Sequence, residues 1–282
     1  MMRSISRSVK RGLSFSMAVL MTTMALAQAP SEAANNITIN PSQFSFSTGR
    51  NDRSVQNVTI TNQGNKPMQI KLYLGDWLRD SLGNHAYFEP GTITASCSPW
   101  LSLSQSFVEV PANGSASFTL TLATPDADSV EQRMRWSMLF VELAEEKSLP
   151  SEQGKGVRTV MAKKQRFGLH VYHNPTAVTR KEMRMVDFRP VDAAKRLYRV
   201  TLKNTGATQL SCQTYVELTS LTDADNVRKI DGDNFPMFPG QTRQVDIVLP
   251  KDVVAGKYNV MAAADAGEDV PLEAAQQELD IQ

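Results

Sequence analysis

Histidine is the side chain best suited to move a proton or bind a metal near neutral pH, and the chain has three: His85, His170 and His173. His170 and His173 are three residues apart in a stretch that alternates like a β-strand, which places them on opposite faces of a sheet. They therefore cannot easily share a metal ion. No Gly-x-Ser-x-Gly elbow, glycine-rich phosphate loop or His-Glu-x-x-His motif is present. We predict neither enzyme activity nor a cofactor or metal.

The acidic segment Asp223-Ala-Asp225-Asn226 is similar to the first half of a calcium loop. The second half does not follow, since Asn234 stands where such a loop ends in glutamate. We therefore interpret the segment as a turn. Asp76-Trp77 is also acidic, but it fits a strand end or turn.

Two cysteines, Cys97 and Cys212, lie too far apart to form a metal framework, whose ligands cluster at short spacing. One falls in each predicted domain, so they are either small core residues, which we favour, or an interdomain disulfide. Three tryptophans, Trp77, Trp100 and Trp136, follow strand-like runs in the first half. Core packing is the simple interpretation of these rings, and a sugar-stacking platform is the alternative.

The first 27 residues have the pattern of a cleaved secretion signal. Basic residues are followed by an apolar run over 13–24 and by the small-x-small sequence Ala25-Leu-Ala27. An anchor that is never cut is the alternative. Because the signal removes four basic residues, the mature chain has 26 basic and 29 acidic residues, a formal charge of −3. We expect a soluble, exported protein without stable membrane insertion or a nucleic-acid partner.

Short β-type runs separated by turn residues predict an all-β chain, and the pattern occurs twice. Val58-Thr-Ile-Thr-Asn62-Gln-Gly64 is repeated as Val200-Thr-Leu-Lys-Asn204-Thr-Gly206, each a strand and an Asn-x-Gly turn whose glycine could adopt positive φ. The first copy has an insertion, placed in 76–99. We predict two immunoglobulin-like β-sandwiches in tandem. The predicted segments are the signal peptide (1–27), a flexible mature N-terminus (28–35), an N-terminal domain (36–174) and a C-terminal domain (175–282).

At the junction of the two copies, the polar segment 145–156 is typical of a mobile loop, and a long strand-like run over 157–175 follows it. Phe167, Leu169 and Val171 suit the core of the first domain. The upstream part contains fewer apolar residues, among them Val157 and Met161. This run either closes its own sheet or offers an edge to another protein.

The run ends Phe167-Gly-Leu-His-Val-Tyr-His-Asn-Pro175 and follows Arg133-Met-Arg-Trp-Ser-Met-Leu-Phe-Val-Glu-Leu143. In this order, and with Val260-Met-Ala-Ala-Ala-Asp-Ala-Gly267 near the end, the chain resembles the PapD-like periplasmic chaperones of pilus assembly. The resemblance implies two immunoglobulin-like domains in an L or boomerang arrangement. It also implies that the long strand is lent to an exported subunit, and that an outer-membrane usher is a further partner.

The resemblance assigns the donor positions to Val157, Thr159, Met161 and Lys163. It implies two basic anchors for the subunit's terminal carboxylate, but Gly168 and Gln43 occupy those positions. Arg166 could replace the missing lysine. Alternatively, Arg166 belongs to an ordinary solvated face.

The family's interdomain ion pairs are also incomplete. Asp265 matches their aspartate, whereas His173 and Trp136 stand at or next to the positions of their arginine and glutamate. The sequence therefore implies a different hinge, packed by Trp136.

Three functions follow from these observations. We favour a chaperone-like protein for a pilus or surface-structure subunit. The first alternative is a non-catalytic immunoglobulin-like scaffold of an envelope or surface assembly, and the second is carbohydrate binding through the tryptophans.

Overall fold

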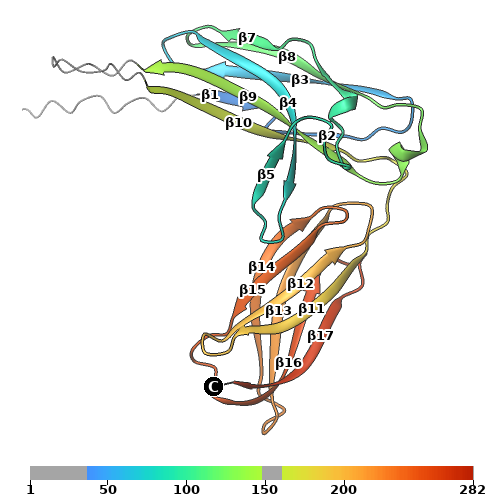
Figure 1. The fold of residues 1–282 in the computed structure, drawn as a ribbon, viewed down its shortest axis with the longest axis vertical. Helices are drawn as coiled ribbons and strands as arrows, with labels where there is room; N and C mark the ends of the chain where they lie inside the picture. Colours follow the sequence, from blue (N-terminus) through green and yellow to red (C-terminus); the bar gives the residue numbers. More distant parts are fainter. Residues whose placement is uncertain (1–36, 148–160, 282) are drawn as a thin grey trace, which may run out of the picture. The chain divides into compact units, whose positions relative to one another are not determined.

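The computed structural model describes residues 37–147 and 161–281, and almost every element in them is a β-strand (Figure 1). The strands form two sandwiches, one over residues 37–173 and one over residues 183–281. The prediction of an all-β chain with two tandem sandwiches is confirmed.

In the first sandwich, one sheet has the order β1-β3-β8-β6 and the other the order β2-β10-β9-β4-β5, with β7 pairing with β4. Two 3₁₀ turns, η1 (Ser98–Trp100) and η2 (Asp128–Glu131), lie in the connections. The strands are β1 (Ile37–Asn40), β2 (Gln43–Phe46), β3 (Arg53–Asn62), β4 (Met68–Arg79), β5 (His85–Phe88), β6 (Leu101–Leu103), β7 (Phe107–Val110), β8 (Gly114–Ala123), β9 (Arg135–Lys147) and β10 (Met161–His173).

The second sandwich repeats the same plan with fewer strands. One sheet has the order β11-β12-β15 and the other the order β14-β13-β16-β17. These strands are β11 (Met183–Asp192), β12 (Leu197–Asn204), β13 (Leu210–Ser220), β14 (Val227–Met237), β15 (Thr242–Val248), β16 (Gly256–Asp265) and β17 (Glu273–Ile281). The two sandwiches share a strand pair. β8 and β15 each follow a proline-containing turn, and they pair with β3 and β12, which each end in an Asn-x-Gly turn.

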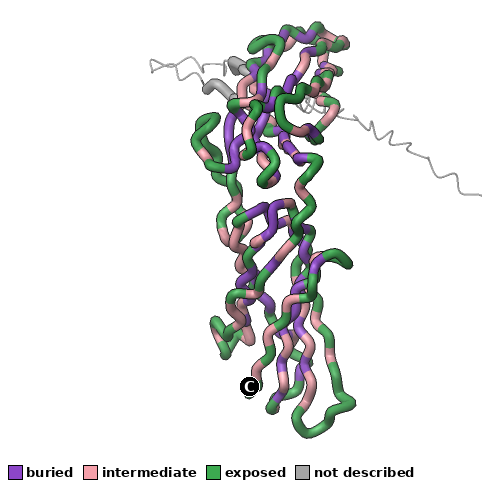
Figure 2. The backbone as a smooth tube through the Cα atoms, turned by 90° about the vertical axis from the view of Figure 1, so that its right-hand side faces the viewer, coloured by how far each residue is buried: buried purple, intermediate pink, exposed green. Residues whose placement is uncertain are grey.

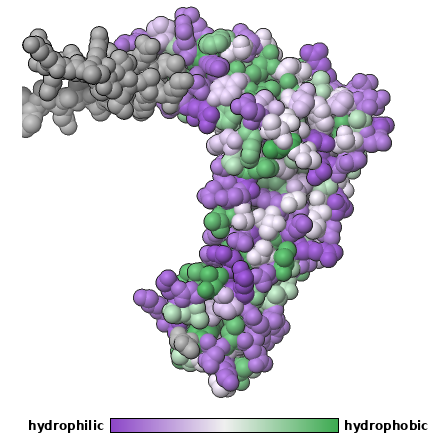
Figure 3. All heavy atoms as spheres, viewed as in Figure 1, coloured by the Kyte–Doolittle hydropathy of each residue, from purple (hydrophilic) through white to green (hydrophobic). Residues whose placement is uncertain are grey.

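The core of each sandwich follows from the period-two alternation of its strands. Buried and exposed residues alternate along the strands in Figure 2. In β10, Leu169 and Val171 point into the first core and Phe167 packs against it, as the sequence predicted. The surface in Figure 3 shows apolar residues in small groups among polar ones.

The two Asn-x-Gly turns are built in the same way. Asn62 and Asn204 are fully buried, and each side-chain oxygen accepts a hydrogen bond from the glycine N–H two residues later, at 2.9 and 2.8 Å. Each side-chain amide donates to backbone oxygens across the turn, Lys66 and Pro111 in the first sandwich and Thr208 and Met237 in the second. The sequence repeat is therefore a structural repeat.

The reason that we predicted for these glycines is wrong. Neither Gly64 nor Gly206 adopts positive φ. Gly206 is required because the backbone passes close by: a Cβ there would lie 2.7 Å from Glu182 N and 2.8 Å from Arg180 O. The composition of a turn predicts that the turn exists. It does not show whether its glycine is needed for a positive φ or for the close approach of another backbone segment.

The insertion of the first sandwich lies between β4 and β7. It contains the β4–β5 hairpin, η1 and β6, whereas the second sandwich goes from β13 to β14 in one short turn. The segment predicted as a loop over 145–156 begins later than expected, because β9 continues through Lys147 and pairs there with Met161. Strand pairing with β10 overrides the polar composition of residues 145–147.

Both cysteines are free and buried, Cys97 in the first core and Cys212 in the second. Burial raises the pKa of Cys97 to about 12 and that of Cys212 to about 11. They are small core residues, as we favoured, and not the two halves of a disulfide.

Candidate functional site

The long strand β10 has two neighbours along only part of its length. It pairs antiparallel with β9 from Met161 to His173, and parallel with β2 only from His170 to His173. No described strand pairs with the other edge of β10 between Met161 and Leu169. This segment, which we call the open edge of β10, has a described strand on one side only, and a strand edge without a neighbouring strand is a template for pairing with another chain.

The predicted donor residues map onto this edge only in part. Val157 and Thr159 lie outside the described residues. Met161 and Lys163 are in β10, where their Cα partners on β9 are Lys147 and Glu145. The structure thus places the second half of the predicted donor segment in a strand that is already held on one side by its own sheet.

The three candidate anchors do not form a basic pair. Gln43 is the Cα partner of His170 at the start of β2. Gly168 lies over Met138, whose Sδ would be 2.9 Å from an added Cβ. Arg166 lies over the ring of Phe140, with 4.6 Å between its guanidinium carbon and the ring centroid.

Arg166 also interacts with Tyr73 and Glu142 on the neighbouring strands. The hydrogen bond with Tyr73 is the largest cause that raises the pKa of Arg166, and the charge of Glu142 acts in the same direction. The Tyr73 hydroxyl in turn donates to Glu142 Oε2 at 2.8 Å. This arrangement matches the alternative in which Arg166 is part of the outer face of its own sheet.

The predicted hinge residues do not come together either. His173 is buried in the first sandwich, with its Nε2 3.2 Å from Thr48 O, and its ring packs against Trp100. Asp265 accepts a hydrogen bond from Gly267 N at 2.8 Å in the turn after β16, and no ion pair among the described residues joins it to His173. Of the predicted hinge residues, Trp136 contacts the second sandwich, through Phe238, with 5.0 Å between the ring centroids.

Phe238 belongs to a cluster of rings on the outer face of the β4-β9-β10 sheet, opposite its sandwich core. Trp77 is fully buried at the centre of this junction cluster, where it contacts His85, Trp136, His170, Tyr172 and Phe238. Because Trp77 and Trp136 are buried among other rings, they do not form an exposed sugar-stacking platform. Core packing is the correct interpretation for these two tryptophans.

Backbone hydrogen bonds join the same two regions. Met134 N donates to Ala207 O at 2.8 Å, and Gln244 N of β15 donates to Ser81 O in the β4–β5 turn at 2.7 Å. That turn is built on Asp80, which accepts from Leu82 N and Asn84 N. Gly83 there has φ +92 and lies directly under the guanidinium of Arg243, so a side chain would collide with it.

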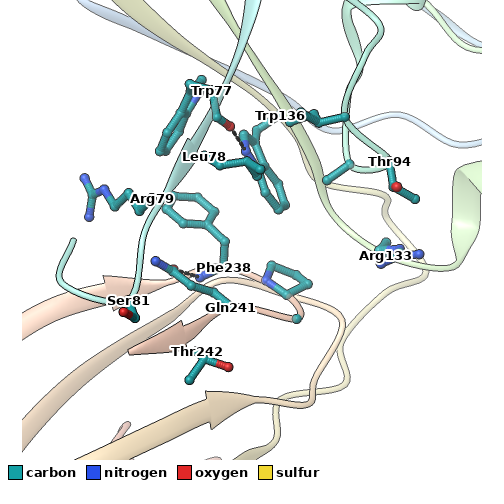
Figure 4. Close-up of a pocket in the computed structure, with 14 residues that line it drawn as sticks. Trp77, Leu78, Arg79, Ser81, Thr94, Arg133, Trp136, Phe238, Gln241 and Thr242 are labelled. Carbon is teal, nitrogen blue, oxygen red and sulfur yellow. Dashed lines mark hydrogen bonds between the residues drawn. The ribbon is translucent and has the colours of Figure 1, made fainter. Parts of the chain in front are cut away.

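A pocket of about 460 Å³ lies beside the junction cluster (Figure 4). Its apolar wall includes Trp77, Trp136 and Phe238, and the turn 238–241 closes one side. Arg79 and Arg133 both contribute to the lining, and no aspartate or glutamate does. Figure 4 shows Arg79 and Gln241 on one side of the Phe238 ring and Arg133 on the opposite side.

Burial lowers the pKa of both histidines of the junction cluster, His85 and His170. Burial lowers the pKa of His170 to about 4, and the nearby His85 and Arg79 act in the same direction. Burial and Arg79 also lower the pKa of His85. His170 and His173 lie on opposite faces, as predicted, and the structure instead brings His85 to His170, with ring centroids 5.6 Å apart. Among the described residues, no group of three or more His, Cys, Asp or Glu side chains could hold a metal.

Asp76 fixes the insertion to the end of the first sandwich. This buried carboxylate accepts hydrogen bonds from the hydroxyls of Ser96 and Ser98, at 2.7 and 2.8 Å, and from Thr92 N at 3.0 Å. Ser137 on β9 adds a further bond at 3.2 Å. Asp76 therefore positions the loop that carries Ile93 and Thr94 into the pocket wall.

Sequence reasoning did not identify Arg79, Phe238 and Gln241 as site residues, and it considered His85 only as one of the three histidines. The insertion was found from the repeat, but no pattern indicates that its hairpin folds over the outer face of the sheet. The only signal for Phe238 and Gln241 was their place in the repeated turn before β15.

No family model and no curated protein matches the chain. Similarity is found among solved structures. The class 5 fimbriae chaperone CfaA is 14% identical over 86% of this chain and 98% of its own, with a TM-score of 0.48. The CupB2 chaperone of Pseudomonas aeruginosa is 12% identical over 87% of this chain and 100% of its own, with a TM-score of 0.41.

A chain in the structure of the Salmonella enterica SafA pilin with the SafB chaperone is 10% identical, covering 89% of this chain and 98% of its own, with a TM-score of 0.43. Fimbrial chaperones are thus among the structural neighbours of the chain. Since these TM-scores lie below 0.5, the assignment of the fold rests on the strand order given above. Among the described residues, no helix is long and apolar enough to cross a membrane.

Proposed function

We propose that this chain is a periplasmic chaperone-like protein that binds an exported pilus or surface-structure subunit by lending it the strand that includes residues 157–171. The observation that carries the proposal is the open edge of β10. Backbone groups on such an edge can pair with an extended segment of another protein, which gains main-chain hydrogen bonds while its own exposed strands are covered.

The same edge already accepts a strand further along. β2 pairs with β10 from His170 onward, so a partner strand on the open edge would lie in line with β2. The strand is also firmly held from behind, because β9 pairs with it over its whole described length. A strand that is fixed on one side and open on the other is prepared for sheet completion at low entropic cost.

The second candidate is a non-catalytic immunoglobulin-like scaffold of an envelope or surface assembly. It is favoured by the anchor positions: Gly168 has no side chain, Gln43 is uncharged, and Arg166 is engaged by Tyr73 and Phe140. Such a scaffold would hold partners through loops or sheet faces. It would not complete the fold of a subunit.

Two proline variants of adjacent residues separate these candidates. Successive N–H groups of a strand point to opposite sides. One of the two variants, Lys163→Pro or Lys164→Pro, therefore removes a hydrogen bond to β9, and the other removes only an N–H group on the open edge. The variant that keeps the parent's melting temperature is the edge-blocking one. Its partner is the matched control for loss of stability.

Each variant is co-expressed in the periplasm with the subunit encoded beside it, and the complex is purified and quantified. Strand donation predicts that the edge-blocking variant is folded but recovers much less subunit than the parent chain. If this variant recovers as much subunit as the parent, or if the parent forms no complex, the donation proposal is wrong and the scaffold is favoured.

A further inference from the structure

The pocket beside the junction cluster contains hydrogen-bond donors that no described residue uses. The side-chain nitrogen of Gln241 and the Nε of Arg79 are both buried and have no hydrogen-bond partner among the described residues. Both residues line the pocket. Buried donors without acceptors are costly, so their presence together in one pocket indicates a ligand that accepts hydrogen bonds.

The orientation of the Gln241 side-chain amide is fixed, and its Nε2 is the atom without a hydrogen-bond partner among the described residues. Its Oε1 accepts a hydrogen bond from Phe238 N at 3.0 Å, which fixes which end of the amide is the oxygen. The backbone of the same residue is fixed as well, because Gln241 N donates to Phe238 O and Gln241 O accepts from Asn204 N. The unused Nε2 is therefore a donor in a rigid turn.

Arg79 is held by rings and not by a carboxylate. Its guanidinium carbon lies 5.7 Å from the ring centroid of Trp77 and 5.9 Å from that of Phe238, and no ion pair of Arg79 is found among the described residues. Arg243 is nearby and also has buried nitrogens, Nε and Nη1, without hydrogen-bond partners in the described part of the chain. With Arg133 on the opposite side and no acidic residue in the lining, the pocket favours an anion.

We propose that this pocket binds a small organic acid whose carboxylate accepts hydrogen bonds from Arg79 and Gln241 and whose apolar body packs against Phe238 and Trp136. The volume of about 460 Å³ lies within the range of small-molecule sites, roughly 300–1,000 Å³. A charged acceptor between a guanidinium and an amide forms stronger bonds than a neutral one. This site is separate from the open edge of β10, so the inference does not depend on strand donation.

Phenylacetate and its neutral isostere phenylacetamide are suitable probes, because they differ only in the group that meets the two donors. Binding is followed by tryptophan fluorescence, to which Trp77 and Trp136 contribute, and by the side-chain amide signals of Gln241 in a nitrogen–proton NMR spectrum. We expect phenylacetate to bind about tenfold or more tightly than phenylacetamide and to shift the Gln241 signals.

Gln241→Glu is the decisive variant. Glutamate keeps an oxygen for Phe238 N but replaces the free donor with a second carboxylate oxygen, so phenylacetate affinity should fall about tenfold or more while phenylacetamide affinity changes little. Arg79→Gln should weaken phenylacetate in the same way, and Arg53→Gln on β3, remote from the pocket, should not. Equal affinity for the two probes, no binding of either, or unchanged phenylacetate affinity in Gln241→Glu would overturn the inference.

Discussion

Gln43 is the partner of His170 where β2 begins to cover the edge of β10. Before this pair, the described part of β10 is in register with β9 alone, and from this pair onward β10 lies between β9 and β2. One strand therefore does two things. Its end closes the first sandwich through Leu169 and Val171, and its beginning offers a backbone edge.

The two Asn-x-Gly turns should respond differently to the same substitution. In Gly206→Ala the new Cβ meets the backbone at Glu182 N and Arg180 O, which cannot move without disturbing the start of β11. In Gly64→Ala it meets side-chain atoms of Asn62 and Met68, at 3.0 and 3.7 Å. We expect Gly206→Ala to lower the free energy of unfolding by about 1–3 kcal/mol or more, and Gly64→Ala by clearly less. Urea denaturation measures both, and equal losses would contradict the close-approach explanation.

Removing the charge of Asp76 should loosen the insertion. Asp76→Asn keeps one oxygen but turns an NH₂ group toward the Ser96 and Ser98 hydroxyls or Thr92 N, so at least one buried donor loses its acceptor. The expected loss in the free energy of unfolding is about 2–4 kcal/mol. The control is Asp225→Asn in the exposed β13–β14 turn, which should be close to neutral. An Asp76→Asn variant as stable as the parent would show that the network does not fix the loop.

The junction cluster makes stability depend on pH through His170. The pKa of this histidine is about 4 in the folded chain, against an ordinary value of about 6.5 in the unfolded chain. Between these pH values the unfolded state binds more protons than the folded state. The contribution of His170 to the free energy of unfolding is therefore complete above about pH 6.5 and is lost as the pH drops from about 6.5 to about 4. His170→Phe keeps a ring against Trp77 and cannot titrate.

We therefore expect His170→Phe to lose less stability than the parent when chemical denaturation is repeated from pH 7 down to pH 4. Some dependence should remain, because burial also lowers the pKa of His85 and His173. Parallel stability curves for the variant and the parent would mean that His170 titrates normally in the folded chain.

Much of the fold was predictable because it follows from local pattern. Alternation in segments such as 115–122 and 137–143 gives a strand whatever its partners are, and the repeat of Val58–Gly64 in Val200–Gly206 gives a second sandwich. The secretion signal and the domain boundaries stay predictions.

The junction was not predictable, because it depends on which surfaces meet. The hinge was expected to involve Trp136, which does contact Phe238, together with His173 and Asp265, which bond within their own sandwiches. Gln241 shows the limit most clearly. Its side chain is a candidate ligand donor only because Phe238 N binds its oxygen and leaves its nitrogen without a hydrogen-bond partner among the described residues. A single sequence does not show this contact.

Residue-level amide hydrogen exchange over 161–173 tests strand donation most directly. In the free chain we expect fast and slow exchange to alternate along Met161–Leu169, because every second N–H faces the open edge. The amides of His170–His173 should all exchange slowly. In the complex with the co-expressed subunit, the fast amides of Met161–Leu169 should become protected while those of His170–His173 stay unchanged. Fast amides in Met161–Leu169 that remain fast in a stable complex would contradict strand donation by β10.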